Sequence, residues 1–294
     1  MNLSEQFSES YSKNCPKRQV VLNSHGIQNI MVCPRKFVYN EIFEPTEKSV
    51  KMEKGIVFAK FLEIYYRRKM RGKPTVVTPF WTSTIIKRTG CTKEEADIVW
   101  RAAANYSKVY GNETWEPLVA EAGFTIPFYE DEELSIYLEG RPDLVVRDKT
   151  TGHLIVVDHK TQGSFYDLPH FSHQPMAYLY AISKLVEQPK YYFCYNYIVF
   201  KKDPDYRRSV VEVSIDQINM WRSEVLCYIL RVLKMGEFFR TFNCSTQFGL
   251  CDFYKVCINP SEQYQLWYLN NLFKYREKRK ASWSMSMKLS SNKS

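Results

Sequence analysis

Two periodicities of apolar residues alternate along the chain and divide it into helix-forming and strand-forming parts. Apolar residues recur at helical spacing over 26–43, 52–70, 92–110, 167–186, 216–239 and 261–275. Alternating or short β-branched apolar runs predict strands over 123–129, 134–148, 154–161, 191–200 and 209–215. This order of helices, three strands, a helix, two strands and helices predicts an α/β or α+β fold with a central mixed sheet.

Breaking and capping residues set the ends of several predicted elements. Pro34 cannot continue a helix, so the first helix should break near Cys33. Thr92 suits a helix N-cap, and Glu95 three residues later completes the pattern of a capping box. The polar segment 1–24 is expected to be loose.

The pattern contains no strong linker, so we expect a single domain over residues 1–275. It would carry a helical insertion at about 60–115 and a cysteine-containing loop at 243–258. The tail 276–294 holds six Lys and Arg against one Glu, which is +5 of the net charge of +9. We expect a disordered basic end, either simply solvated or in contact with phosphates.

Composition excludes two classes of protein. No stretch approaches the roughly 18 consecutive apolar residues of a membrane span, and the N-terminus has no apolar signal segment. Eight cysteines without a signal peptide indicate a reducing compartment, where metal ligands and buried thiols are commoner than disulfides. We therefore expect a cytoplasmic protein with no membrane partner.

Opposite charges stand at the end of a short apolar strand, in the stretch "VVDHK". Asp158 and Lys160 are two residues apart, so their side chains project from one face of the strand and His159 from the other. A hairpin that turns at 149–153 places Asp143 opposite Asp158. Like charges directly opposite each other destabilise a hairpin, and a divalent cation between them would reverse that effect.

This arrangement suits the cleavage of phosphodiester bonds. Two carboxylates bind Mg²⁺ or Mn²⁺, which activates a bound water, and a nearby lysine can orient that water and offset negative charge. The structural alternative for Asp158 and Lys160 is an ion pair at a strand end. On the next helix, Gln174 and Tyr178 share a face, either as polar tips near the site or as a surface Gln and a core Tyr.

The stretches "GRPDLVV", "VVDHK" and "HQPMAY" together resemble the PD-(D/E)XK nuclease superfamily, and the Gln-x-x-x-Tyr element resembles its RecB-like exonuclease branch. The resemblance implies a restriction-endonuclease-like core, a central mixed β-sheet flanked by helices. It implies Asp143, Asp158 and the backbone carbonyl of His159 as ligands of Mg²⁺ or Mn²⁺. The catalytic residues that it implies are Asp143, Asp158, Lys160, Gln174 and Tyr178.

Upstream, "GIVFAKFLEIYY" (55–66) resembles the helix of this branch that reads Gly-x-x-x-His-x-x-x-Glu. Ala59 stands where the family usually has a metal-binding His, which removes one expected ligand. Glu63 matches the acid one turn later and is expected to contribute to the metal site, with a helix-surface acid as the alternative. Glu121 matches another recurrent acid of the branch.

Three cysteines in the loop 243–258 are spaced C-x6-C-x5-C, which does not fit the zinc-ribbon spacings. One cysteine before the nuclease motifs and three after them resemble the iron–sulfur nucleases, such as CRISPR-adaptation exonucleases, AddB nuclease domains and related phage nucleases. The resemblance implies a [4Fe-4S] cluster that acts as a C-terminal staple, with Zn²⁺ in the same four thiolates as the alternative. The implied ligands are Cys33, Cys244, Cys251 and Cys257.

From this resemblance we expect a metal-dependent DNA exonuclease that acts on single strands or duplex ends in replication, recombination or repair. A phage origin would place it in the host-cell cytoplasm. The chain has no helicase P-loop, so a helicase or recombination partner would supply any translocation. The alternative, favoured by Ala59, is a non-catalytic DNA-binding or recombination-accessory module with a degenerate nuclease site.

Overall fold

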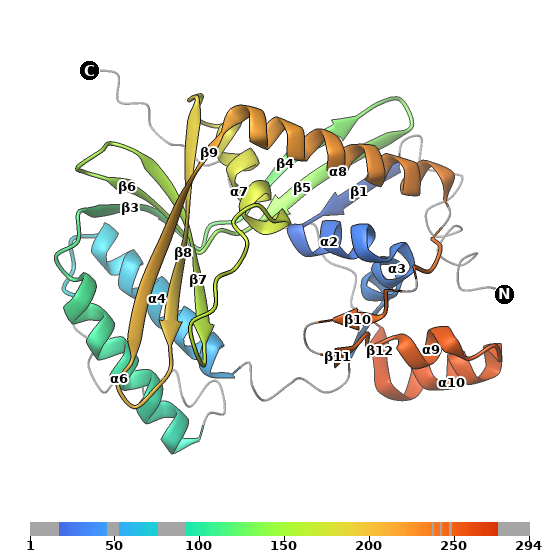
Figure 1. The fold of residues 1–294 in the computed structure, drawn as a ribbon, viewed down its shortest axis with the longest axis horizontal. Coiled ribbons are helices and arrows are strands. Elements are labelled where there is room, and N and C mark those ends of the chain that lie inside the picture. The colour runs from blue at the N-terminus through green and yellow to red at the C-terminus, as the bar shows by residue number, and fades with distance from the viewer. Residues whose placement is uncertain are drawn as a thin grey trace. The chain divides into compact units, whose positions relative to one another are not determined.

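The computed structural model describes residues 18–45, 53–75, 92–236, 238–241, 243–246 and 249–275 (Figure 1). Its contacts divide the chain into two compact units. The described residues of the motif unit lie within 49–124 and 140–219, and those of the cysteine unit lie within 1–48, 125–139 and 220–284. The single domain expected over 1–275 stays a prediction, and the basic tail 276–294 lies outside the described residues.

A five-stranded mixed sheet forms the centre of the motif unit, in the order β3-β6-β7-β8-β9. The strands are β3 (Trp115–Ala120), β6 (Leu144–Asp148), β7 (Leu154–Gln162), β8 (Lys190–Val199) and β9 (Asp205–Ser214). β7 and β8 are parallel, and α7 (His173–Ser183) lies in the crossover between them, whereas the other neighbours are antiparallel. The predicted central mixed sheet is confirmed and fits a restriction-endonuclease-like fold.

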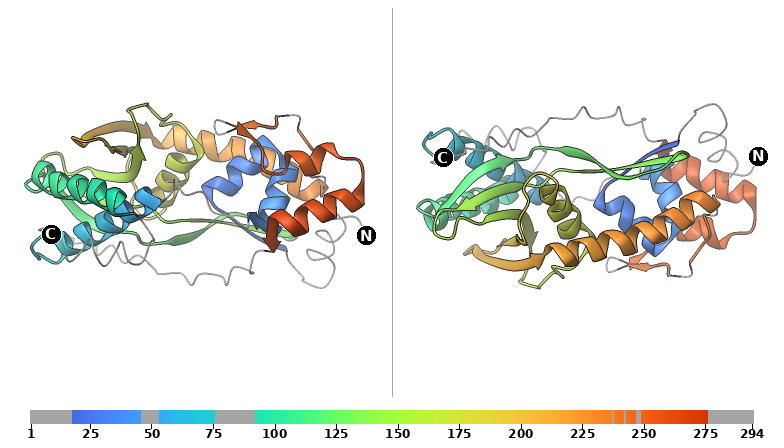
Figure 2. Two further views of the ribbon diagram at one scale, coloured as in Figure 1. Left: turned by 90° about the horizontal axis from the view of Figure 1, so that it is seen from below. Right: turned by 90° about the horizontal axis from the view of Figure 1, so that it is seen from above.

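Two helices, α4 (Glu53–Met70) and α6 (Lys93–Tyr110), cover one face of this sheet (Figures 1 and 2). Their aromatic and aliphatic side chains form one buried cluster with Ile155 and Val157 of β7. Successive residues of a strand point to opposite faces, so Asp158 and Lys160 project from the other face of the sheet. The predicted capping box of Thr92 and Glu95 begins α6.

A three-stranded sheet in the order β1-β5-β4 forms part of the cysteine unit, with β1 parallel to β5. Its strands are β1 (Arg18–Leu22), β4 (Phe124–Glu130) and β5 (Leu134–Gly140). The helices of this part of the chain are α2 (Ser24–Val32), α3 (Pro34–Ile42), α8 (Ile215–Met235), α9 (Tyr254–Ile258) and α10 (Glu262–Leu272). Two short strand pairs complete it: β2 (Phe43–Pro45) with β12 (Phe273–Tyr275), and β10 (Ser245–Thr246) with β11 (Gly249–Leu250).

Several predicted boundaries were wrong for identifiable reasons. The strand predicted over 134–148 is two strands, β5 and β6, and Pro142, which has no N–H for a ladder, lies in the break between them. The segment expected to be loose contains β1, and β3 was missed. Helix α8 ends before Gly236, whose φ of 66° is typical of a helix C-terminus. Within the described ranges, no helix combines the length and apolar character that a membrane crossing needs.

Candidate active site

The β6–β7 hairpin brings two acids together, Asp158, which is buried, and Asp143, which is half-buried. Leu144 pairs with Val157, and the same register carried one residue further places Asp143 opposite Asp158, as the turn predicted. Asp158 is only 2% exposed. Burial raises the pKa of Asp143, and the neighbouring Asp158 carboxylate raises it further. Burial also raises the pKa of Asp158, so the pair resists ionisation in the absence of a cation.

Lys160 connects this pair of acids to helix α7. Its Nζ lies 2.7 Å from Oδ2 of Asp158 and donates to Oε1 of Gln174 at 2.9 Å. The amide of Gln174 donates to the Tyr178 hydroxyl at 3.3 Å, and that hydroxyl donates to the carbonyl of Arg141 at 3.2 Å. One chain of contacts therefore joins Asp158, Lys160, Gln174 and Tyr178. It ends at the carbonyl of Arg141, two residues before Asp143.

Helix α7 approaches this segment closely because residue 140 is a glycine. A Cβ at Gly140 would lie 2.6 Å from the ring of Phe124 and 2.9 Å from the ring of Tyr178. Burial raises the pKa of Tyr178, so its hydroxyl keeps the proton that it donates. The Gln-x-x-x-Tyr pair thus braces the lysine at one end and the chain before Asp143 at the other.

His159 contributes to the site through its backbone. Its N–H donates to Oδ2 of Asp143 at 2.7 Å, while its imidazole lies on the opposite face of the sheet. There the ring stacks on Tyr66 at 5.8 Å and its Nδ1 lies 2.8 Å from the amide nitrogen of Asn196. Burial, followed by the charge of Arg208, lowers the pKa of His159 to about 3, so the ring is neutral. The role of its carbonyl as a metal ligand stays a prediction.

Glu121 is connected directly to the pair of acids. Its N–H donates to the carbonyl of Asp143 at 3.0 Å, and its carboxylate pairs with Arg141 at 2.9 Å. Its φ of 53° is in the left-handed region, an uncommon strain for a residue with a Cβ and one that clusters at functional sites. Burial raises the pKa of Glu121, and the charge of Glu121 raises the pKa of Asp143, so a third acid lies beside the site.

Helix α4 approaches strand β7 at Gly55, the glycine of the Gly-x-x-x-His-x-x-x-Glu pattern. A Cβ at Gly55 would lie 2.9 Å from the hydroxyl of a β7 threonine. Ala59, where a histidine was expected, is exposed. The carboxylate of Glu63 pairs with Lys60 at 2.5 Å and with Arg67 at 2.8 Å on its own helix. Its role as a metal ligand stays a prediction.

The donors at this site suit a hard divalent cation. Within the described residues, no three His, Cys, Asp or Glu side chains are grouped closely enough to hold a metal by themselves. Mg²⁺ usually needs only one or two carboxylates, because it keeps several waters and binds substrate phosphates. Oδ2 of Asp158 is buried and makes an ion pair with Lys160 but no well-directed hydrogen bond. The two acids therefore fit Mg²⁺ or Mn²⁺.

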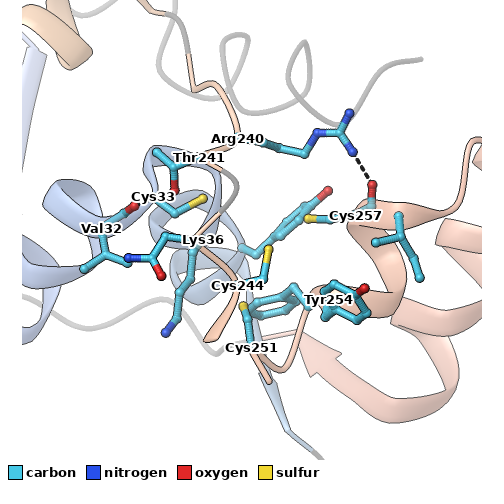
Figure 3. A pocket seen from close by; sticks show the side chains of 13 residues that line it. Val32, Cys33, Lys36, Arg240, Thr241, Cys244, Cys251, Tyr254 and Cys257 are labelled. Carbon is cyan, nitrogen blue, oxygen red and sulfur yellow. Dashed lines mark hydrogen bonds between the residues drawn. The ribbon is translucent and has the colours of Figure 1, made fainter. Parts of the chain in front are cut away.

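The four cysteines implied as cluster ligands line one cavity of about 300 Å³ in the cysteine unit (Figure 3). Cys33 ends α2 and caps α3, where Pro34 occupies the first turn, so the predicted helix break is confirmed. The N–H of Cys251 donates to the carbonyl of Cys244 at 2.8 Å. Residues 211 positions apart in the sequence, Cys33 and Cys244, thus face the same space.

The thiols that line the cavity are close enough to influence one another. Burial raises the pKa of Cys257 to about 11, and the thiols of Cys33 and Cys251 add to the increase. The aromatic rings of Tyr39 and Phe253 lie beside the cavity, 5.0 Å apart. Anionic thiolates are thus disfavoured here unless a cationic group binds them.

Three residues that support the site, Arg141, Asn196 and Arg208, were not predicted from the sequence. The guanidinium of Arg141 pairs with Glu121, and its backbone carbonyl accepts from the Tyr178 hydroxyl. Asn196 contacts the His159 side chain on the other face of β7, and Arg208 pairs in register with Asn196 on the next strand. For Asn196 a signal was present, since it is a polar residue in the middle of the apolar run "YYFCYNYIVF".

The model of the PD-(D/E)XK nuclease superfamily matches residues 25–257, so the chain belongs to this superfamily of nucleases. No curated protein matches the chain. The fold is similar to the crystal structure of a candidate exonuclease from Eubacterium rectale, with 13% identity, a TM-score of 0.48, and 84% of this chain and 92% of that chain covered. It is also similar to the crystal structure of SSO0001, with 17% identity, a TM-score of 0.33, and 82% and 87% covered.

The raised pKa values predict how the stability of the metal-free protein depends on pH. An acid whose pKa is raised by folding stabilises the fold below its unfolded pKa, and this contribution is lost as the pH rises through the folded pKa. We therefore expect the metal-free protein to lose stability as the pH rises from about 4. Asp143→Asn should unfold with a free energy about 1–2 kcal/mol higher than wild type at alkaline pH.

Urea unfolding in the presence of EDTA, at about pH 5 and about pH 8.5, would measure this effect. Asp148→Asn is the matched control, because the Asp148 carboxylate accepts from Thr150 and its pKa is lowered. An Asp143→Asn variant that is less stable than wild type at the higher pH would contradict the prediction.

Proposed function

We propose that this chain is a metal-dependent DNA exonuclease that hydrolyses phosphodiester bonds of single strands or duplex ends. The observation that carries the proposal is the pair of acids, buried Asp158 and half-buried Asp143, with Lys160 held between Asp158 and Gln174. Membership of a nuclease superfamily supports it. Two acids and a lysine fixed in this way suit hydrolysis, whereas a module that only binds DNA would have no need to place two acids beside each other.

Each residue has a role in this proposal. Asp143 and Asp158 would hold Mg²⁺ or Mn²⁺, with the carbonyl of His159 and with Glu63 as further ligands. The bound metal would supply an activated water and stabilise charge on phosphorus. Lys160, held by the acid and the amide, would orient that water and offset developing negative charge. Gln174 and Tyr178, which the resemblance places among the catalytic residues, would act by fixing the lysine.

The four-cysteine cavity is assigned in the same proposal to a [4Fe-4S] cluster, with Zn²⁺ as the alternative. A structural zinc ion needs its sulfur ligands about 2.3 Å away. The four thiols line a cavity of about 300 Å³, which is wide for a single ion and favours the larger cluster. It would join the N-terminal helices to the cysteine loop and contribute stability rather than chemistry.

The wider setting of this activity follows from the resemblance in the sequence. We assign the chain to replication, recombination or repair of DNA in a phage or prokaryotic setting, in the cytoplasm. A helicase or recombination protein is the expected partner, since the sequence carries no P-loop of its own.

A degradation assay with matched substrates tests the proposal. Linear end-labelled single-stranded DNA should be degraded to short products with Mg²⁺ or Mn²⁺, and EDTA should stop the reaction. The same DNA closed into a circle is the control and should persist, because it has no ends. Cleavage of the circle would show endonuclease action and contradict the exonuclease assignment. Binding of linear DNA without any cleavage would favour the accessory module instead.

A further inference from the structure

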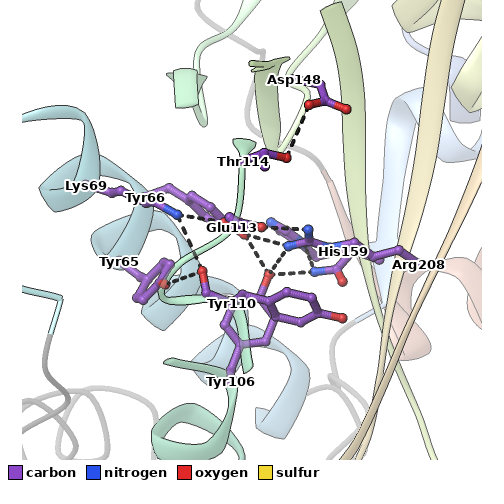
Figure 4. A network of polar contacts seen from close by, with 11 residues as sticks. Tyr65, Tyr66, Lys69, Tyr106, Tyr110, Glu113, Thr114, Asp148, His159 and Arg208 are labelled. Carbon is purple, nitrogen blue, oxygen red and sulfur yellow. Dashed lines mark hydrogen bonds and ion pairs between the residues drawn. The ribbon is translucent and has the colours of Figure 1, made fainter. Parts of the chain in front are cut away.

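A row of polar side chains crosses three strands of the motif unit, on the face of the sheet opposite the acids. His159 on β7 pairs in register with Asn196 on β8, and Asn196 pairs with Arg208 on β9. Residues paired in register on neighbouring strands project from the same face. The three side chains are thus neighbours in register, although they lie in an apolar core covered by α4 and α6. Figure 4 shows His159 and Arg208 with the polar groups around them.

Asn196 links the row together through its amide. Its Nδ2 lies 2.8 Å from Nδ1 of His159 and donates to the hydroxyl of Tyr106 at 2.9 Å. Tyr106 in turn shares a hydrogen bond of 2.7 Å with the hydroxyl of Tyr66, whose ring stacks on the imidazole. Asn196 is completely buried, so these contacts hold its amide in one orientation.

Arg208 anchors the outer end of the row. Its guanidinium lies between the rings of Tyr110 and Trp115, 3.8 Å from each centroid, and pairs with Glu113 at 2.6 Å. It also donates to the hydroxyl of Tyr66 at 3.3 Å. Apolar side chains of similar volume often stabilise a core as well as a buried ion pair does, so stability alone does not explain these charges.

The inner end of the row reaches the active site through the backbone. Asn196 holds the imidazole of His159 on one face of the sheet. The backbone N–H of the same residue donates to the carboxylate of Asp143, which belongs to the site on the other face. Asp158 and Lys160 are its immediate neighbours in the chain. A shift of β7 by one residue would turn both of them away from the site, so a fixed His159 fixes the catalytic register.

We propose that Asn196, whose amide donates to the same Tyr106 hydroxyl as Arg208, is a positioning residue for the nuclease reaction. It holds the imidazole of His159 and thereby orients the backbone that binds the Asp143 carboxylate. This inference rests on the proposed function of the site. Asn196 touches neither metal nor substrate, and its effect is transmitted through His159.

Two variants test the proposal, and each leaves the apolar packing in place. Asn196→Leu removes the amide, and His159→Phe keeps a ring to stack on Tyr66 but removes its acceptor. Each should lower kcat by about 10–100-fold and weaken Mn²⁺ binding in calorimetry by about tenfold, as partners of metal-binding groups do. The KM for single-stranded DNA should stay within about twofold of wild type. Tyr206→Phe is the matched control, because it removes a partly buried hydrogen bond from the same sheet to the carbonyl of Ala102.

The double variant Asn196→Leu, His159→Phe provides a readout that a merely structural role would not give. The effects on kcat should be far less than additive, because both changes break one contact. Values of kcat and Mn²⁺ affinity within about twofold of wild type in His159→Phe would overturn the proposal, even if Asn196→Leu does not fold. Asp158→Ala is measured in parallel. Full activity in Asp158→Ala would reject the proposed active site itself, which separates that failure from a failure of the positioning role.

Discussion

Asp158→Ala and Lys160→Ala are each expected to lower kcat for single-stranded DNA by about a thousandfold or more. Asp158 is a buried acid of the proposed metal site, and Lys160 is held 2.7 Å from it. Neither effect should extend to the affinity for DNA, because the contacts of these side chains are with each other and with Gln174. The predicted loss is therefore one of chemistry rather than binding.

Single-turnover degradation of end-labelled DNA, with binding measured in Ca²⁺, would separate the two quantities. Asp148→Ala and Lys201→Ala are matched controls, since Asp148 lies at the opposite end of the same hairpin and Lys201 is exposed in the same unit. Degradation that persists equally in Asp158→Ala and Lys160→Ala would reject the site.

Cys257→Ser is expected to remove the iron of the cysteine unit and to destabilise that unit. Its thiol lines the same cavity as three other thiols, and four thiolates are needed to hold a cluster. Anaerobically purified wild type should be brown and hold about four irons per chain, and the variant should hold almost none. Because metal binding contributes directly to folding free energy, the variant should also melt at a lower temperature and be cleaved faster by protease.

Cys227→Ser is the matched control, because Cys227 is an exposed free thiol on α8 outside the cavity. It should keep both the iron and the melting temperature of wild type. A colourless wild-type protein with stoichiometric zinc would refute the cluster and leave the zinc alternative. Wild-type protein that contains neither iron nor zinc, and whose melting temperature does not change when either metal is added, would refute both the cluster and the zinc site.

The sequence by itself determined the features that depend on near neighbours along the chain. Strand periodicity placed Asp158 and Lys160 on one face, and a short turn placed Asp143 opposite Asp158. Pro34 predicted the helix break at Cys33 because a proline ring cannot continue a helix. Each of these is fixed by backbone geometry within a few residues or within one hairpin.

Only the tertiary structure decided which distant elements meet at these residues. The contact from Lys160 to Gln174 depends on a loop whose path no periodicity describes. The row from His159 through Asn196 to Arg208 depends on the pairing of β7 with β8, which are parallel and joined by a crossover, and of β8 with β9. The shared cavity of Cys33 and Cys244 likewise depends on packing between segments far apart in sequence. Local pattern fixes the direction of a side chain, but the partner that it meets is fixed by the burial of apolar surface and by strand order, which act over the whole unit.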